Sequence, residues 1–499
     1  MADAYDLLVI GSGPSGQKAA IAAAKMRLKV ALVERRHGLM GGVCLHTGTI
    51  PSKTMREAIL HLTGYRQRGV YGDRFRQKRH ITMDELRRKL SSVVQHEMDV
   101  LHEYLDRNQI DLLMGEARFL NPNTVEVSRP GHTQQVTAGK ILVGCGTRPA
   151  RPPHIPFDGE TIFDSDELLQ LKKIPRSMIV VGAGVIGIEY AIMFATLGVE
   201  VTVIDGRERL LDFCDREIVE MLMWHARSLG MVFRLGEDMV RMTRTGERTV
   251  IVELESGKRL LAEAALFSAG RVGDTDGLNL PAAGLELDDR GRLWCDENFR
   301  TSTPNIYGVG DVIGFPSLAS TSMEQGRRAV CAAFDQPFSA ARNLPYGLYT
   351  IPEISMVGKT EQQLTKERVP YEVGVASFRE IARGHISGDE TGLLKLLFHR
   401  ESREILGVHC IGETATEIIH IGQAVMSLGG TMDYFRDTVF NYPTMAEAYK
   451  VAAFNGLNKL RLAKMSAPVV MVSTGGEDEI LSEIDQLRRE LVHEATAAV

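Results

Sequence analysis

The sequence YDLLVIGSGPSG at residues 5–16 decides the fold of the first part of the chain. Its apolar start is typical of a short buried strand, and the Ala-rich segment at residues 17–26 favours a helix directly after the glycines. In such a unit Gly11 permits a tight turn, Gly13 lets the backbone approach a pyrophosphate, and Gly16 allows close packing of helix on strand. We therefore predict a dinucleotide-binding unit at this end of the chain.

An acidic residue in the next strand supports this prediction. Residues 29–33 are expected to form a second strand, which ends at Glu34, about 20 residues after the glycines. A carboxylate at this place can accept hydrogen bonds from the hydroxyls of a ribose. A glycine motif alone is weak evidence, but strand, glycine turn, helix and acid in this order together predict dinucleotide binding.

The same pattern recurs in the sequence MIVVGAGVIG at residues 178–187, whose corresponding glycines are Gly182, Gly184 and Gly187. Two such fingerprints on one chain predict two dinucleotide cofactors. The strand that follows ends at Asp205, which suits the ribose diol of NAD. This carboxylate would repel the 2′-phosphate of NADP by about 4 kcal/mol per charge pair at about 4 Å. Arg207 can offset this repulsion, so we interpret the pair as able to accept both nucleotides.

The stretch GGVCLHTGTIPSK at residues 41–53 carries one cysteine where a redox-active pair would need two. A thiolate attacks and a second sulfur closes the disulfide in such a pair. Here Cys44 is followed five positions later by Thr49, whose hydroxyl cannot form a disulfide. This excludes dithiol–disulfide chemistry within the stretch.

Composition limits the remaining functions. The chain has 499 residues, is 44% hydrophobic and has a net charge of −6, which argues against nucleic acid or an anionic membrane as a partner. Its six cysteines lack metal-ligand spacing, so we predict no metal site and a reducing environment. The start of the chain shows no basic-then-apolar leader and no apolar run of transmembrane length, from which we expect a cytoplasmic protein.

The frame at residues 41–53 resembles the active-site signature of the flavoprotein disulfide reductases, the family of lipoamide dehydrogenase and glutathione reductase. The chain departs from that signature at Thr49. It also departs at NYPTMAE, residues 441–447, where Tyr442 takes the place of the family's histidine base while Glu447 is kept. A phenol with a pKa near about 10 is a poor base at neutral pH. Sulfur and base are missing together, and this combination is similar to the soluble pyridine nucleotide transhydrogenases.

The resemblance covers residues 5–463 and implies a fold class: α/β, with two Rossmann-like dinucleotide-binding domains, the NAD domain inserted in the FAD domain, and an α+β C-terminal dimerisation domain. The implied divisions are residues 1–150 and 276–344 for the FAD-binding domain, 151–275 for the NAD(P)-binding domain, 345–465 for the interface domain and 466–499 for a C-terminal extension. We expect that extension to be helical and to dock on its own oligomer, because its apolar residues have helical spacing. A disordered tail and a helix that binds another partner are the alternatives.

The resemblance also implies site residues. Lys53 would approach flavin N5 and pair with Glu189, Cys44 and Thr49 would set local polarity, and Tyr442 and Glu447 would have a structural role near the flavin of the second subunit. The implied FAD-binding residues are Gly11, Gly13, Gly16, Glu34, Gly42, Cys44, Lys53, Gly146, Asp311 and Ala319. The implied NAD(P)-binding residues are Gly182, Gly184, Gly187, Glu189, Asp205, Arg207 and Gly270.

The implied activity is FAD-dependent, Si-specific transhydrogenation, in which hydride passes reversibly from NADPH to NAD through the flavin with ping-pong kinetics. Its partners would be nicotinamide dinucleotides, and the chain would form a homodimer or a higher homo-oligomer. An NAD(P)H oxidase or quinone reductase needs only FAD and one nicotinamide site, so this alternative stays open. A lipoamide-dehydrogenase-like reductase would need the missing sulfur and base, and a flavoprotein without catalytic activity is opposed by Lys53 and Glu189.

Overall fold

The computed structural model describes residues 3–72, 75, 77–78, 80–246, 248–339 and 343–466. The first sheet is built around β1 (Asp3–Ile10), whose neighbours β2 (Val30–Glu34) and β6 (His132–Val143) run parallel to it. The apolar residues of β1 and β2 are buried, because helices cover the sheet. Its order is β3 (Asp111–Met114), β2, β1, β6, β5 (Thr124–Arg129), β4 (Glu116–Asn121).

A second parallel sheet contains the second fingerprint. Its central strand β9 (Ser177–Val181) is followed by a glycine turn and by α6 (Val185–Thr196), a helix that is apolar and buried along most of its length. The order of the sheet is β11 (Val232–Leu235), β10 (Glu200–Asp205), β9, β15 (Ala264–Phe267), β8 (Ile162–Asp164). Beside it lie α7 (Arg216–Ser228) and the antiparallel strands β12 (Met239–Thr245), β13 (Thr249–Leu254) and β14 (Arg259–Ala262).

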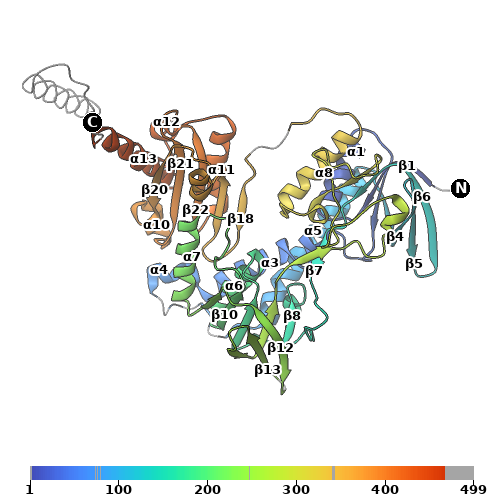
Figure 1. Cartoon of the computed structure of the whole chain (residues 1–499), viewed down its shortest axis with the longest axis horizontal. Coiled ribbons are helices and arrows are strands. Elements are labelled where there is room, and N and C mark those ends of the chain that lie inside the picture. Colours follow the sequence, from blue (N-terminus) through green and yellow to red (C-terminus); the bar gives the residue numbers. More distant parts are fainter. Residues whose placement is uncertain are drawn as a thin grey trace, which may run out of the picture.

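The first sheet, which is mixed because β4 and β5 are antiparallel, is joined to the second sheet by a pair of crossing strands. The chain leaves the first sheet through β7 (Thr147–Pro149) and returns through β16 (Arg271–Gly273), and these two strands pair with each other. After its return, β17 (Ile306–Gly308) adds to β6 in the first sheet. The second unit is thus inserted in the first, as we predicted, and Figure 1 shows β7 between the two.

The third unit is an antiparallel sheet with helices. Its order is β18 (Tyr346–Leu348), β19 (Ile354–Gly358), β22 (Ile405–Ile411), β21 (Leu393–His399), β20 (Tyr371–Ser377). The helices α11 (Ala415–Ser427) and α13 (Glu447–Ser466) pack on this sheet, which appears in orange and red in Figure 1. The predicted α/β class, with two Rossmann-like units and an α+β C-terminal unit, is confirmed.

The remaining elements connect or cover these sheets. Near the first glycine turn lie α1 (Pro14–Lys25) and α8 (Ala319–Ala333), which pack on each other. Further elements are α2 (Gly42–His46), α3 (Thr49–Thr63), η1 (Tyr65–Gln67), α4 (Arg68–Tyr71), α5 (Met83–Arg107), η2 (Leu168–Gln170), η3 (Leu280–Ala283), η4 (Gly310–Ile313), α9 (Glu361–Lys366), η5 (Phe378–Glu380), α10 (Ala382–Ser387) and α12 (Met432–Asp437). None of the described helices combines the length and the apolar character needed to cross a bilayer.

Part of the first unit differs from what helical spacing suggests. Apolar residues between 81 and 115 suggest one helix, but α5 ends at Arg107 and residues 111–114 form β3. Gln109 has a φ of 54°, which ends the helical path, and Asp111 to Met114 then pair with β2. The predicted helix within residues 466–499 lies outside the described residues, apart from the end of α13 at Ser466.

Between the first and second units, His225 on α7 meets Tyr65 of η1, with 2.6 Å between His225 Nε2 and Tyr65 Oη. Burial lowers the pKa of His225 to about 4, well below its ordinary value of 6.5. The unfolded chain therefore takes up a proton near pH 6.5, whereas the folded chain does so only near pH 4. The stability that neutral His225 contributes is present above pH 6.5 and is lost as the pH falls toward 4.

We predict that lowering the pH from 7 to 5 destabilises the natural protein by about 2 kcal/mol more than it destabilises His225→Gln. Glutamine cannot titrate but can still accept a hydrogen bond from Tyr65. Thermal unfolding of both proteins at the two pH values measures the difference. Parallel changes of the two midpoints with pH would contradict it.

Candidate active site

The first glycine turn leaves a space shaped for a pyrophosphate. Gly11 has a φ of 103°, and a Cβ on it would lie 2.5 Å from the Gly144 carbonyl oxygen. A Cβ on Gly16 would lie 1.9 Å from the Gly11 carbonyl oxygen, so helix α1 packs directly on the turn. A Cβ on Gly13, the N-cap of α1, would meet nothing within 4 Å. Exposed amides at a helix N-terminus favour an anion, so this turn fits FAD.

Glu34 is held at the end of β2 by the same turn. Its Oε2 accepts hydrogen bonds from Ser12 Oγ (2.5 Å) and from the Ser12 amide (3.3 Å). Ser12 Oγ in turn accepts a hydrogen bond from the Gly41 amide (2.9 Å), which ties the turn to the start of α2. Glu34 Oε1 accepts from the Arg36 amide (2.9 Å). The carboxylate is therefore fixed where a ribose would meet it.

A cavity runs from this turn along the carboxyl ends of the strands. Predicted FAD-binding residues that line it are Gly11, Gly13, Glu34, Gly42, Cys44, Gly146, Asp311 and Ala319. Gly16 lies behind the turn and acts through packing. Burial raises the pKa of Asp311, and the charge of Arg271 together with a hydrogen bond from Thr147 opposes that rise.

The second fingerprint repeats this geometry. Gly182 has a φ of 101°, and a Cβ on Gly187 would lie 2.0 Å from the Gly182 carbonyl oxygen. Gly184 is the N-cap of α6, and a Cβ on it would meet nothing within 4 Å. Both Gly182 and Gly184 line a cavity of about 1200 Å³, whereas Gly187 acts by packing. This turn therefore fits the pyrophosphate of a second dinucleotide.

Asp205 and Arg207 form a bidentate ion pair at the edge of this second cavity. Arg207 donates from Nε to Asp205 Oδ1 (2.9 Å) and from Nη2 to Asp205 Oδ2 (2.8 Å), and the Ala183 amide donates to Oδ2 (2.6 Å). Burial acts to raise the pKa of Asp205, but these hydrogen bonds outweigh it and hold the pKa below its usual value. Asp205 is therefore ionised, and a single arginine neutralises it.

The two cavities meet at one place. Thr49, Asp311 and Ala319 line both of them, and Gly270 lines the second. A flavin ring at the end of the first cavity would thus face a nicotinamide at the end of the second. The geometry brings the two predicted dinucleotide sites together at the residues around Thr49.

A lysine and a glutamate from different units stand at this meeting point. Lys53 on α3 donates from Nζ to Glu189 Oε2 (2.7 Å) on α6. The Glu189 side chain is only 6% exposed, so it depends on this partner. Its other oxygen accepts a hydrogen bond from the Tyr349 amide (2.8 Å), and Lys53 Nζ also lies 4.9 Å from the centre of the Tyr349 ring. The predicted Lys53–Glu189 pair is therefore formed in the structure.

Cys44 lies beside Thr49 without a second sulfur. Burial raises the pKa of the Cys44 thiol, and a hydrogen bond with Thr49 and the charge of Lys53 act in the opposite direction. The effect of burial is the larger one and the pKa stays above its usual value, so Cys44 is a neutral thiol at pH 7. All six cysteines of the chain are free.

Tyr442 and Glu447 lie away from these cavities within one chain. Tyr442 is 73% exposed, and neither residue lines the two cavities described above. Glu447 begins α13, and its Oε2 is buried without a hydrogen-bond partner among the described residues.

Two residues with positioning roles were missed by the sequence analysis. Ser12 lies inside the glycine motif, where only the glycines attract attention. Tyr349 acts largely through its backbone amide, which leaves no signature in the side-chain pattern. Its only signal is its place at the start of the third unit, directly after β18.

Comparison with known proteins agrees with this geometry. The model of the pyridine nucleotide-disulphide oxidoreductase family matches residues 5–326, and that of its dimerisation domain matches residues 344–453. A relative named soluble pyridine nucleotide transhydrogenase, from Mycobacterium tuberculosis, is 53% identical over 460 residues, which cover 92% of this chain and 98% of that protein. A relative of the same name from Colwellia psychrerythraea is 47% identical over 462 residues, covering 91% and 98%.

Two solved structures have a similar fold. The HOCl-induced flavoprotein disulfide reductase RclA from Escherichia coli has a TM-score of 0.81 and 27% identity, covering 90% of this chain and 99% of that chain. LpdA from Mycobacterium tuberculosis has a TM-score of 0.83 and 25% identity, covering 91% and 99%.

We predict that Thr49→Cys forms a disulfide with Cys44 in air, because the two residues line the same cavity and Thr49 acts on the pKa of the Cys44 thiol. Titration of the denatured variant should then find one free thiol fewer than in the control Thr49→Cys/Cys44→Ser. In that control the thiol at position 49 has no second sulfur at position 44 and stays free. NADPH should deliver one more electron pair to Thr49→Cys than to the natural protein. Two free thiols at positions 44 and 49 after oxidation would contradict the predicted proximity.

Proposed function

The chain belongs to the pyridine nucleotide-disulphide oxidoreductase family, and we propose that within it the protein is an FAD-dependent transhydrogenase that passes hydride from NADPH to NAD. One observation carries the proposal. The Lys53–Glu189 pair is intact where the two dinucleotide cavities meet, while the sulfur needed for disulfide reduction is replaced by Thr49. The site keeps what flavin chemistry needs and lacks what dithiol chemistry needs.

FAD, when bound in the first cavity, supplies a ring that can take a hydride from one nicotinamide dinucleotide and give it to another. The Lys53 ammonium provides a positive charge at the meeting point, which favours negative charge developing there. Glu189 fixes the position of that ammonium, and the Tyr349 amide fixes Glu189. Cys44, as a neutral thiol beside Thr49, contributes polarity without reacting.

One nicotinamide site serves both substrates in this proposal. The chain has two glycine fingerprints, and FAD takes the first. NADPH must therefore leave as NADP before NAD enters, which gives ping-pong kinetics. Because the 2′-phosphate lies far from the reacting ring, the direction follows the cofactor ratios, each tenfold being about 1.4 kcal/mol. We further propose Si-specificity and a cytoplasmic location.

The same site accepts both nucleotides through the Asp205–Arg207 pair. With NAD, Arg207 remains on Asp205 and the carboxylate receives the ribose hydroxyls. With NADP, the Arg207 guanidinium turns from Asp205 to the 2′-phosphate and binds this second anion through two hydrogen bonds. Arg207 is 47% exposed in its side chain, so it has room to turn.

We also propose that the three sheets mark the domains, with the FAD-binding domain at residues 1–150 and 276–344, the NAD(P)-binding domain at 151–275, the interface domain at 345–465 and a C-terminal extension at 466–499. The matched dimerisation domain supports a homodimer. Tyr442, Glu447 and their surroundings would then contact the second subunit near its flavin, in an isologous arrangement.

The test of the proposed function is anaerobic mixing of the flavin-loaded protein with NADPH and a reducible NAD analogue. We expect the reduced analogue to form rapidly, at a rate that follows the reduction and reoxidation of the flavin spectrum. The contrary result is a flavin that NADPH reduces without any reduced analogue forming. If the protein then reduces oxygen or a quinone steadily, the oxidase or quinone-reductase alternative replaces this proposal.

Nucleotide choice should depend on Arg207. Arg207→Ala should raise the KM for NADPH by roughly tenfold or more, because the 2′-phosphate loses its cation and meets an uncompensated Asp205. The KM for NADH should change far less. Arg259→Ala, which removes an exposed arginine of the same unit, is the matched control. Equal changes of the two KM values in Arg207→Ala would contradict the proposed exchange.

A further inference from the structure

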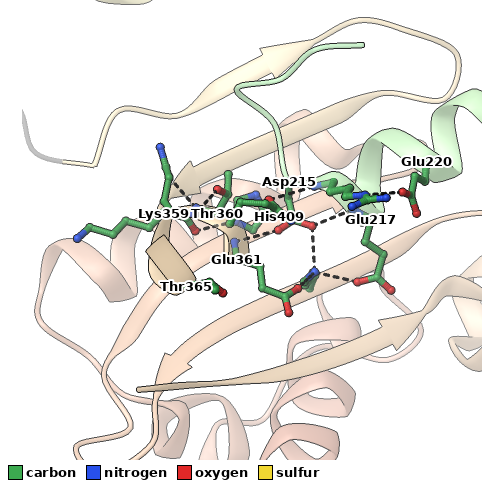
Figure 2. Close-up of polar contacts among 12 residues, drawn as sticks. Asp215, Glu217, Glu220, Lys359, Thr360, Glu361, Thr365 and His409 are labelled. Carbon is green, nitrogen blue, oxygen red and sulfur yellow. Dashed lines mark hydrogen bonds and ion pairs between the residues drawn. The ribbon is translucent and has the colours of Figure 1, made fainter. Parts of the chain in front are cut away.

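A fully buried lysine lies between the second and third units. Lys395, on β21, has no exposed surface and donates from Nζ to Asp215 Oδ1 (2.9 Å), Glu217 Oε2 (2.8 Å) and Glu361 Oε2 (2.5 Å). Asp215 and Glu217 belong to the start of α7, whereas Glu361 begins α9. Figure 2 shows Asp215, Glu217 and Glu361 converging from the two units. We call these four residues the Lys395 cluster.

Asp215 is bonded to both units. It is the N-cap of α7, and its Oδ1 accepts a hydrogen bond from the Glu217 amide (3.2 Å). Its Oδ2 accepts from the amide of Glu361, across the contact, at 3.1 Å. Asp215 is completely buried, so loss of Lys395 would leave a buried charge that backbone amides alone must compensate. The start of α7 is therefore held to the third unit by buried charged groups that are costly to separate.

The three carboxylates of the Lys395 cluster need a cation close to them. The oxygens of the three carboxylates lie within 4.8 Å of one another, a spacing that could hold a metal ion. Here the Lys395 ammonium binds all three. Burial acts to lower the pKa of Lys395, but hydrogen bonds to Glu217 and Glu361 outweigh it and raise the pKa. Burial lowers the pKa of the neighbouring His409, whose Nε2 lies 2.9 Å from the Lys359 carbonyl oxygen, so His409 adds no charge at neutral pH.

The Lys395 cluster lies at one end of a loop whose other end is the nucleotide site. Residues 206–214 connect the Asp205–Arg207 pair to Asp215. Leu211 and Cys214 within this loop are buried. The Phe213 ring packs on the Tyr346 ring with 5.1 Å between their centres, and Tyr346 lines the second cavity. A displacement of α7 would therefore be passed to the loop that carries Arg207.

We propose that Lys395 is a positioning residue for nucleotide selection, which holds loop 206–214 so that Arg207 can reach the 2′-phosphate of NADP. The inference rests on the proposed function in two respects, namely that the second cavity takes both NAD and NADP and that Arg207 binds the 2′-phosphate. It assigns to the third unit a part in nucleotide choice, although Lys395 itself touches no substrate. Its signature is a selective loss of NADP affinity, because Arg207 interacts with the 2′-phosphate that NAD lacks.

The test measures binding of NADP and of NAD to the flavin-loaded, oligomeric protein by titration calorimetry. Lys395→Met should weaken NADP binding by roughly fivefold or more and NAD binding by clearly less. Lys395→Ala should behave in the same way, and added ethylammonium ion should restore its NADP affinity by refilling the space among the carboxylates. Unchanged affinities, or equal losses for NADP and NAD, would overturn the proposal.

A milder variant covers the case in which the lysine variants do not fold. Glu361→Gln removes one carboxylate at a position that is 34% exposed in its side chain, and it should weaken NADP binding in the same direction but less. Glu367→Gln, which removes an exposed carboxylate just after the same helix, is the matched control and should change nothing. If Glu361→Gln binds NADP as the natural protein does, the proposal fails. Because binding is measured without turnover, an absence of transhydrogenation would refute the proposed function separately.

Discussion

The salt bridge between Lys53 and Glu189 is the interaction on which the active site depends. It joins α3 of the first unit to α6 of the second, and the Tyr349 amide of the third unit completes the coordination of Glu189. A carboxylate that is nearly buried must be paired and hydrogen-bonded, since an unpaired charge there would cost several kcal/mol. The three units can satisfy Glu189 only in one relative arrangement, and that arrangement also places the ends of the two dinucleotide cavities against each other.

Other contacts hold the same arrangement from different sides. Where the chain crosses between the parallel sheets, Arg271 donates to Thr147 Oγ1 (2.9 Å) and to the Thr147 carbonyl oxygen (2.8 Å), so the outgoing and returning strands are bound together. Between α7 and the third unit, Lys395 forms a further link. A hydride donor and acceptor must be held within a few tenths of an ångström of the reacting geometry, and such a requirement explains why charged contacts join all three units.

The glycine turns, the strands that precede them and the acids that follow could be predicted because each depends on local backbone geometry. Gly11 and Gly182 need positive φ, and Gly16 and Gly187 have no space for a side chain, so sequence and structure agree there. The Lys53–Glu189 contact was predicted only through a family resemblance, since 136 residues separate the partners. Tyr349, Ser12 and Lys395 were not predicted. Their roles arise from tertiary contacts through a backbone amide, a hydroxyl and a buried ammonium, which leave no periodic or spaced signal in the chain.

We propose that one nicotinamide site, used twice, connects NADPH to NAD. The most direct measurement reduces the flavin-loaded protein with NADPH under anaerobic conditions, removes all nucleotide by rapid gel filtration, and then adds NAD alone. We expect NADH to form in an amount equal to the flavin present, without further NADPH. If NADH forms only when NADPH and NAD are present together, hydride passes within a ternary complex, which contradicts a single nicotinamide site used twice.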